Sequence, residues 1–310
     1  MVKVDYIVEY DKSDPLSIET YSQRLIGKTF REICAEDDER QTMIFRDGSS
    51  EYGTSDVSST KRNKGNLGQI VEERFFHYAC NSDARADFYE AGVELKVTPY
   101  KINRDGSLAA KERLVLTMID YYQVVNEKFE ESHLWNKSKL ILLVYYLYMK
   151  EIEYNLDYKI SYSKLFTPPA QDRKIIQHDY DIIVSKIKAG KAHELSEGDT
   201  LYLGAAPKAA TSKDRRKQPF SEELAKPRAF AYKSSYMTYV LNHYIAPGKT
   251  TYEPIVREDI VDSFEDYVIE KVNRFQGYSV EELCEEFEVD RQNKPKSLEA
   301  ILAYRILGIK

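Results

Sequence analysis

The sequence has few of the features that mark secreted, zinc-binding or membrane-spanning proteins. Among its 310 residues there are three cysteines, Cys34, Cys80 and Cys284, and none has the paired spacing of a zinc site or a disulfide framework. The longest apolar run, residues 140–149, is about half as long as a membrane span. The first residues carry charges and lack the apolar core of a signal peptide. We therefore expect a cytoplasmic protein with no membrane partner.

Two other kinds of site are also missing from the sequence. No glycine-rich loop stands at a strand-to-helix turn, where nucleotide phosphates are usually held, so ATP dependence is not expected. The five histidines never fall into metal-ligand spacing and are assigned to packing or to the surface. The sequence thus argues against nucleotide-driven activity and against a histidine-bound zinc.

What is present is the composition of a globular protein, with 42% hydrophobic and 31% charged residues. The net charge of −6 conceals a strong asymmetry along the chain. Residues 208–233 contain eight basic side chains against three acidic ones, whereas residues 260–290 contain ten acidic side chains against two basic ones. The two regions are therefore expected to face different partners, and the basic one suits a polyanion.

Hydrophobic periodicity predicts a mixed α/β protein. Apolar residues at helical spacing predict helices at residues 19–38, 175–187 and 234–245, a helix entered through Gly65 whose edge carries Glu72, and a purely helical region from residue 262. Strands are expected at residues 93–98, 114–118, 140–148 and 201–203, and polar loops at residues 47–66 and 208–217. Ser279 and Glu282 have the spacing of a helix-capping box.

Asp87, Glu94 and Lys96 form the constellation most capable of chemistry. Alternation along a strand places Glu94 and Lys96 on one face, about 7 Å apart at roughly 3.3 Å rise per residue, and Asp87 can approach from the preceding strand or turn. Carboxylate oxygens suit Mg²⁺, and Lys96 could orient or deprotonate a water for attack on a phosphodiester. Spacing alone leaves a second interpretation open, because Glu and Lys two residues apart often form an ordinary solvated strand face.

Residues 63–100, NKGNLGQIVEERFFHYACNSDARADFYEAGVELKVTPY, resemble the catalytic segment of the MutH/Sau-type GATC endonucleases. The resemblance continues through KERLVL, SHLWNKSK, KAHELSEGDTLYLGAAPKAA and KPRAFAYKSSYMTYVL, in the order of the family, over roughly residues 20–245. The HELSEG and AFAYKSSYMT stretches are closer to the Sau-type restriction enzymes than to MutH, so the restriction branch is favoured.

The resemblance implies a restriction-endonuclease-like fold: a mixed sheet flanked by helices, with two lobes forming a DNA cleft and a helical C-terminal extension. It implies that Asp87, Glu94 and Lys96 are the nuclease triad, that Glu72 is an additional metal-site carboxylate, and that the cofactor is Mg²⁺. Together with the basic charge it points to nine DNA contacts: Lys64, Gly65, Lys137, Pro207, Lys208, Arg215, Arg216, Arg228 and Lys233.

The expected function is that of a type II restriction endonuclease domain, which cuts double-stranded DNA at GATC and leaves 5′-phosphate ends. Residues 1–250 are expected to form the catalytic domain, and residues 251–310 a helical connector to a C-terminal MutH-like half that this chain lacks. Such a half, or a dimer partner, would serve double-strand cutting. A MutH-like mismatch-repair nicking enzyme and a non-catalytic DNA-binding module are the alternatives. One departure from MutH is Ala206, which stands where that family has an arginine before Pro207 and Lys208.

Overall fold

The computed structural model describes residues 9–47, 66–78, 85–252, 264–287, 289 and 298–307. The helices are α1 (Pro15–Ser22), α2 (Phe30–Asp47), α3 (Asn66–Ile70), α4 (Tyr121–Val124), α5 (His133–Asn136), α6 (Ala170–Lys188), α7 (Ser234–Val240), α8 (Phe264–Asn273), α9 (Val280–Glu286) and α10 (Leu298–Ile306). The strands are β1 (Glu94–Ile102), β2 (Leu108–Ala110), β3 (Leu114–Met118), β4 (Ile141–Leu147), β5 (Lys159–Phe166), β6 (Leu203–Pro207), β7 (Arg216–Gln218), β8 (Ser221–Ala225) and β9 (Arg228–Tyr232). The predicted mixture of helices and strands is confirmed.

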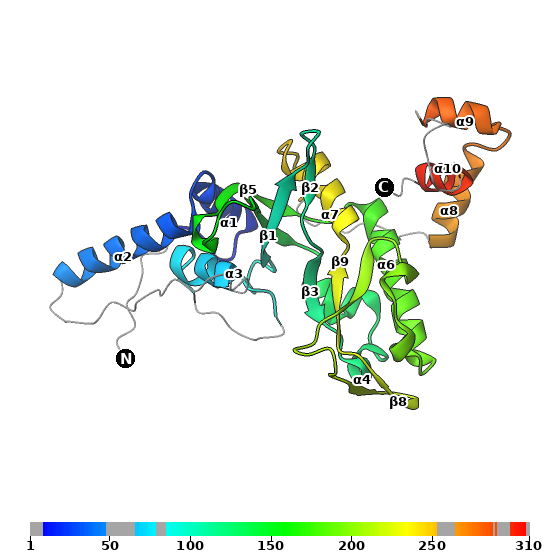
Figure 1. Cartoon of the computed structure of the whole chain (residues 1–310), viewed down its shortest axis with the longest axis horizontal. Coiled ribbons are helices and arrows are strands. Elements are labelled where there is room, and N and C mark those ends of the chain that lie inside the picture. The colour runs from blue at the N-terminus through cyan, green and yellow to red at the C-terminus, as the bar shows by residue number, and fades with distance from the viewer. Residues whose placement is uncertain are drawn as a thin grey trace.

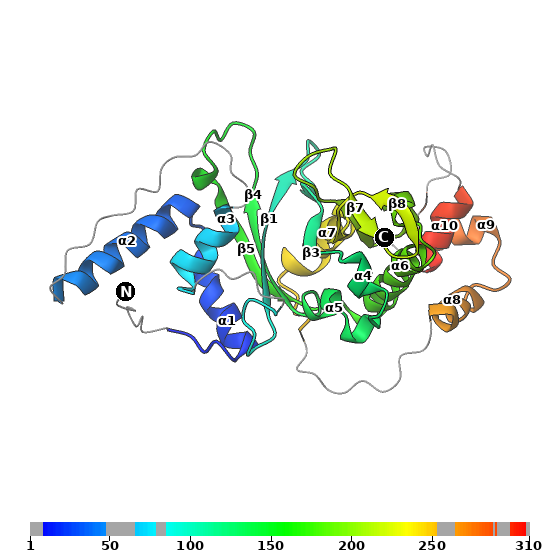
Figure 2. The same cartoon turned by 90° about the horizontal axis from the view of Figure 1, so that it is seen from below.

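A four-stranded mixed sheet, in the order β2-β1-β4-β5, forms the centre of the fold. Strands β1 and β4 are parallel, and the two outer pairs are antiparallel. Helices α1, α2 and α3 lie on one side of this sheet, and α6 with the remaining strands lies on the other (Figures 1 and 2). Covering both faces of a sheet explains why β4 is apolar at every position instead of alternating.

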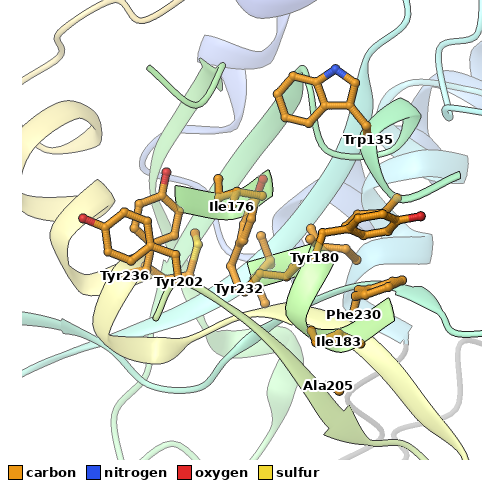
Figure 3. Close-up of a cluster of buried hydrophobic side chains, with 14 of the residues drawn as sticks. Trp135, Ile176, Tyr180, Ile183, Tyr202, Ala205, Phe230, Tyr232 and Tyr236 are labelled. Atoms are coloured by element: carbon orange, nitrogen blue, oxygen red, sulfur yellow. The ribbon is translucent and has the colours of Figure 1, made fainter. Parts of the chain in front are cut away.

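The two faces of β4 belong to different hydrophobic cores. Leu142 and Val144 pack with the N-terminal helices, whereas Leu143 and Tyr145 pack with α6, α7 and the second sheet. Figure 3 shows part of the second core, in which large side chains from separate elements meet: Trp135, Ile176, Tyr180, Ile183, Tyr202, Ala205, Phe230, Tyr232 and Tyr236. The central sheet therefore separates the two hydrophobic cores, and side chains at the ends of its strands can lie between them.

The second sheet is antiparallel, in the order β3-β9-β6, and α6 packs against it. The expected strand at residues 201–203 is wrong in its start, because β6 begins only at Leu203. The buried carboxylate of Asp179 on α6 accepts the backbone N–H groups of Leu201, Tyr202 and Leu203 at 2.8, 2.6 and 2.8 Å. This side chain takes the hydrogen bonds that a sheet neighbour would otherwise receive there.

A continuous helix over residues 19–38 is also wrong. Helix α1 ends at Ser22, a short 3₁₀ turn follows, and α2 begins only at Phe30. Between them Gly27 has a φ of 89°, and its N–H donates to the carbonyl of Ile160 at 2.9 Å. The segment is drawn to the edge of β5, and this long-range pairing overrides the helical periodicity.

The C-terminal helices α8, α9 and α10 have a small apolar cluster of their own around Cys284, Val289 and Leu302. The capping box of Ser279 and Glu282 is confirmed, with the Ser279 N–H donating to the glutamate at 2.7 Å. The division of the chain at residue 250 stays a prediction. No helix in the described part of the chain is long and apolar enough to cross a membrane.

Candidate active site

Glu94 and Lys96 lie at the start of β1, on the same face of the strand. Lys96 Nζ is 2.6 Å from Glu94 Oε1, which confirms the predicted alternation. Glu94 pairs in register with Ile141 of β4, and its neighbour Leu95 points to the opposite face and is buried in the core around α1, α2 and α3. The Glu94 side chain is only about 2% exposed. A carboxylate held this far from water needs a cationic partner, and Lys96 supplies one.

Asp87 reaches Glu94 through a tight turn. The backbones of Phe88 and Val93 pair with each other, and the turn between them contains Gly92 at a φ of 66°. Asp87 Oδ2 accepts the N–H of Leu95 at 2.8 Å, which brings this carboxylate to the base of β1. Burial and the nearby negative charge of Glu94 raise the pKa of Asp87 to about 6. The carboxylates of Asp87 and Glu94 therefore lie close together in one partly desolvated site.

Lys137, expected to contact DNA, points into the same group of side chains. Its Nζ lies 3.4 Å from each carboxylate oxygen of Glu94, and its side chain is 13% exposed. It directly follows α5, a short helix whose first turn is capped by the buried hydroxyl of Ser132. Glu94 Oε2 is shielded from solvent and accepts no hydrogen bond within the described residues. Two ammonium groups thus offset the charge of one buried carboxylate.

Glu72 lies in the π-helical turn Val71–Phe75 that continues α3. The end of this turn is tied down by two tyrosine hydroxyls, because Tyr10 donates to the carbonyl of Phe76 at 3.0 Å and Tyr21 to that of Phe75 at 3.4 Å. Glu72 is half-buried and close enough to Asp87 to contribute to its raised pKa. A π-helical turn is a frequent feature of functional sites, since it redirects a side chain by one residue.

Tyr78 follows this turn and is not among the site residues expected from the sequence. Its ring packs edge-on against Phe88 with 5.1 Å between ring centroids, next to Asp87. Burial, together with the negative charges of Asp87, Glu72 and Glu94, raises the pKa of Tyr78 far above its ordinary range. The only sequence signal was its position six residues after Glu72, which does not distinguish a core tyrosine from a site residue.

The donor set suits a hard cation that needs few protein ligands. Within the described residues no three His, Cys, Asp or Glu side chains converge as a complete metal site. Asp87 and Glu94 offer two carboxylates, and Mg²⁺ is commonly held by one or two carboxylates plus waters and substrate phosphates. Glu94 Oε2 is buried and accepts no hydrogen bond from any described residue, so it is an oxygen that such a cation could bind.

The other residues expected to contact DNA lie in different environments. Pro207, Lys208, Arg215 and Arg216 are exposed. Lys64 and Gly65 lie outside the described residues. The loop expected at residues 208–217 ends before Arg216, which begins β7. Ala205 and Ala206, which precede that loop, are buried in β6.

Arg228 and Lys233 each bond to a backbone carbonyl within the protein. Arg228 is 8% exposed, and its guanidinium donates to the carbonyl of Ala205 at 2.6 Å. Lys233 donates to the carbonyl of Thr200, and burial lowers its pKa. Both belong to β9 or directly follow it, so their side chains support the second sheet. The two DNA contacts were expected from charge, which does not reveal the side of a sheet that a residue occupies, and they stay predictions.

Comparison with known proteins agrees with this architecture. Residues 76–179 match the family model of the DNA mismatch repair enzyme MutH. The chain is 38% identical over 258 residues to the type II restriction enzyme Sau3AI of Staphylococcus aureus, covering 81% of this chain and 52% of that enzyme. It is 26% identical over 185 residues to MutH of Shewanella sp. strain ANA-3, covering 59% of this chain and 80% of that protein.

The chain therefore spans about half the length of Sau3AI. The match to the MutH family model includes the turn with Asp87, strand β1 with Glu94 and Lys96, and Lys137, which directly follows α5. The expected fold class, a MutH-like mixed sheet flanked by helices with a helical C-terminal extension, is confirmed. The region from residue 76 to residue 179 thus matches the MutH family, within a chain that is similar over most of its own length to the restriction enzyme Sau3AI.

Proposed function

We propose that this chain is the catalytic part of a type II restriction endonuclease that hydrolyses double-stranded DNA at GATC and leaves 5′-phosphate ends. The observation that carries the proposal is the buried carboxylate of Glu94 between two lysines and beside Asp87. Salt-bridged carboxylates are common, but this group combines buried negative charge, an accessible amine and a raised aspartate pKa. Such a combination is typical of a site that exchanges a proton or a cation.

Asp87 and Glu94 are the residues proposed to hold a divalent cation, Mg²⁺, with Glu72 available for a second ion or a bound water. When bound, the cation supplies Lewis-acid polarisation of a phosphoryl oxygen and a more acidic water. Glu94 is preorganised for this role because its carboxylate is fixed on a strand buried on both faces. Because the pKa of Asp87 is raised to about 6, its carboxyl is protonated below that pH and would bind a cation less well there.

The two lysines have different proposed tasks. Lys96, 21% exposed, is the more accessible one and is assigned to orienting or deprotonating the attacking water. Lys137 lies deeper and is assigned to stabilising negative charge that develops on the phosphorane. We propose this role in place of the DNA contact expected from the sequence, because the Lys137 ammonium lies 3.4 Å from the Glu94 carboxylate.

Pro207, Lys208, Arg215 and Arg216 are proposed to lie along the DNA. Lysines chiefly secure phosphates, whereas an arginine can read a guanine edge through two hydrogen bonds. Ala206 is buried in β6, so this chain has no side chain at that position that reaches a base. Arg215 and Arg216, both exposed and close in sequence, are the candidates to replace the missing contact.

Strand nicking, the second candidate, is favoured by the MutH match across 80% of that protein's length. One active site cuts one strand at a time, so a dimer partner or a further MutH-like half could serve double-strand cutting. A supercoiled plasmid with a single GATC separates the two activities: nicking yields relaxed circles, and double-strand cutting yields linear DNA.

The decisive experiment is Mg²⁺-dependent cleavage of duplex DNA, followed by sequencing of the product ends. Cuts on the 5′ side of the G in GATC, with 5′-phosphates, are expected. Asp87→Ala and Glu94→Ala should abolish cutting while leaving DNA binding largely intact. Glu73→Ala is a matched control, since this exposed carboxylate lies one residue from Glu72 and accepts a hydrogen bond from Gln69. Undiminished cutting by Asp87→Ala or Glu94→Ala contradicts the assignment, and DNA binding without cleavage in Mg²⁺ and Mn²⁺ favours a non-catalytic module.

A further inference from the structure

The hydroxyl of Tyr78 is a buried polar group whose partner the described structure does not contain. Its oxygen is shielded from solvent and makes no hydrogen bond with any described residue. Leaving a buried hydroxyl unsatisfied costs about 1–3 kcal/mol, so such a group is normally paired in the functional state. The Tyr78 hydroxyl is therefore expected to donate a hydrogen bond to an acceptor close to its ring.

Three contacts place Tyr78 at the carboxylate site. Its backbone N–H donates to the carbonyl of Glu72 at 3.2 Å, which closes the π-helical turn. Its ring rests edge-on against Phe88, the residue after Asp87. The backbone of Phe88 pairs with Val93, the residue before Glu94. The tyrosine is therefore held between the turn that carries Glu72 and the turn that joins Asp87 to Glu94.

The backbone just before Tyr78 is held in an unusual conformation. His77 has a φ of 54°, in the left-handed region that residues other than glycine adopt at a cost. This turn ends the helical path and determines where the next side chain lies. Surrounding contacts stabilise it: the His77 side chain is 6% exposed and lies 3.6 Å from the buried Asp37, which also binds Arg74. Local strain is thus maintained at the position that orients Tyr78.

We propose that Tyr78 is a positioning residue of the carboxylate site, whose hydroxyl donates a hydrogen bond to Asp87 and fixes the direction in which that carboxylate presents its metal-binding oxygen. One oxygen of Asp87 is already held by the N–H of Leu95. The phenol stays neutral beside three carboxylates and can only act as a donor toward them. A second fixed contact removes rotational freedom from the aspartate, which is the usual function of groups behind a metal ligand.

The inference rests on the proposed nuclease function and is tested with Tyr78→Phe, which keeps the ring and removes only the hydroxyl. Tyr180→Phe is the control, because Tyr180 is a second buried tyrosine whose hydroxyl has no hydrogen-bond partner within the described residues, and it belongs to the other core. Binding of Ca²⁺ to the complete protein with duplex DNA is measured by titration calorimetry, together with metal-free DNA affinity and the unfolding midpoint.

Tyr78→Phe should weaken Ca²⁺ binding by about tenfold, in the range expected for a group behind a metal ligand. Metal-free DNA affinity should match that of the parent, the unfolding midpoint should not fall, and Tyr180→Phe should bind Ca²⁺ normally. If Tyr78→Phe binds Ca²⁺ within twofold of the parental affinity, the role proposed for Tyr78 is overturned, but the proposed nuclease function is not affected. Equal weakening in Tyr180→Phe also overturns it, by showing a general packing effect. A parent that neither binds the cation nor cuts DNA refutes the proposed function itself.

Discussion

Lys137 Nζ and the carboxylate of Glu94 are 3.4 Å apart, although 43 residues separate them in the chain. Parallel pairing of β1 with β4 brings them together, because β4 begins a few residues after Lys137 and Glu94 stands at the matching end of β1. Both strands thus start at one edge of the sheet, and the residues at that edge converge. This convergence, and not either residue alone, makes the position chemically distinctive.

Lys137→Ala should separate a role in the chemistry from a role in DNA binding. Removing the Lys137 ammonium leaves the charge of Glu94 less neutralised and takes positive charge away from the reacting phosphate. The cleavage rate should therefore fall by roughly 10²–10³-fold. DNA affinity without metal should change by less than about threefold. Single-turnover cleavage and a filter-binding or anisotropy assay measure the two quantities.

Lys139→Ala is the comparison for that variant, since Lys139 is two residues away and its ammonium lies 3.4 Å from Asn136 instead of a carboxylate. It should cleave at the parental rate. Loss of DNA affinity by Lys137→Ala with an unchanged rate at saturating DNA would return Lys137 to the role of a phosphate contact.

Asp87→Asn should stabilise the metal-free protein while removing its activity. Burial and Glu94 raise the folded-state pKa of Asp87 from 3.8 to about 6, so the protonated form is favoured in the fold. This contribution to stability is complete below pH 3.8 and is lost as the pH rises through about 6. At pH 8 the parent therefore carries an unfavourable charge on Asp87, and the asparagine variant should be about 1–2 kcal/mol more stable. This difference is smaller than the free energy that corresponds to the full pKa shift, because Asp87 is partly exposed to solvent.

Denaturant unfolding without divalent cations, at pH 5 and pH 8, measures this difference. The stability advantage of Asp87→Asn should shrink toward zero at pH 5, where the parental aspartate is mostly protonated. An advantage of the same size at both pH values would mean that the substitution acts through packing and not through charge. Asp105→Asn is a suitable control, because Asp105 is fully exposed in a turn and its pKa is lowered by Ser107.

Lys208 and Arg228 are expected to respond oppositely to substitution. Lys208→Ala removes an exposed charge, so the slope of log DNA affinity against log salt should become shallower by about one unit. Arg228→Met should leave this slope unchanged and lower stability instead, since its guanidinium is bonded to the carbonyl of Ala205 inside the second sheet. Salt titrations of DNA binding and thermal unfolding of both variants check the contrast. A shallower slope for Arg228→Met would restore it as a DNA contact.

Much of the fold was predictable because local patterns and tertiary packing agree. The uniform apolar run of β4, the alternation at Glu94 and Lys96, and the capping box of Ser279 all describe interactions between near neighbours. The predictions that were wrong involve a distant partner. Gly27 pairs with the edge of β5, and Asp179 takes the N–H groups of residues 201–203, and neither partner is adjacent in sequence.

The sequence by itself determined the chemical identity of Asp87, Glu94 and Lys96 and the strand alternation that aligns the last two. Only the tertiary structure decided which other residues join them. It brought Lys137 and Tyr78 to the carboxylates and turned Arg228 and Lys233 inward. The physical reason is that spacing along one strand follows from backbone geometry, whereas the burial and charge environment of a side chain depends on the elements that fold against it.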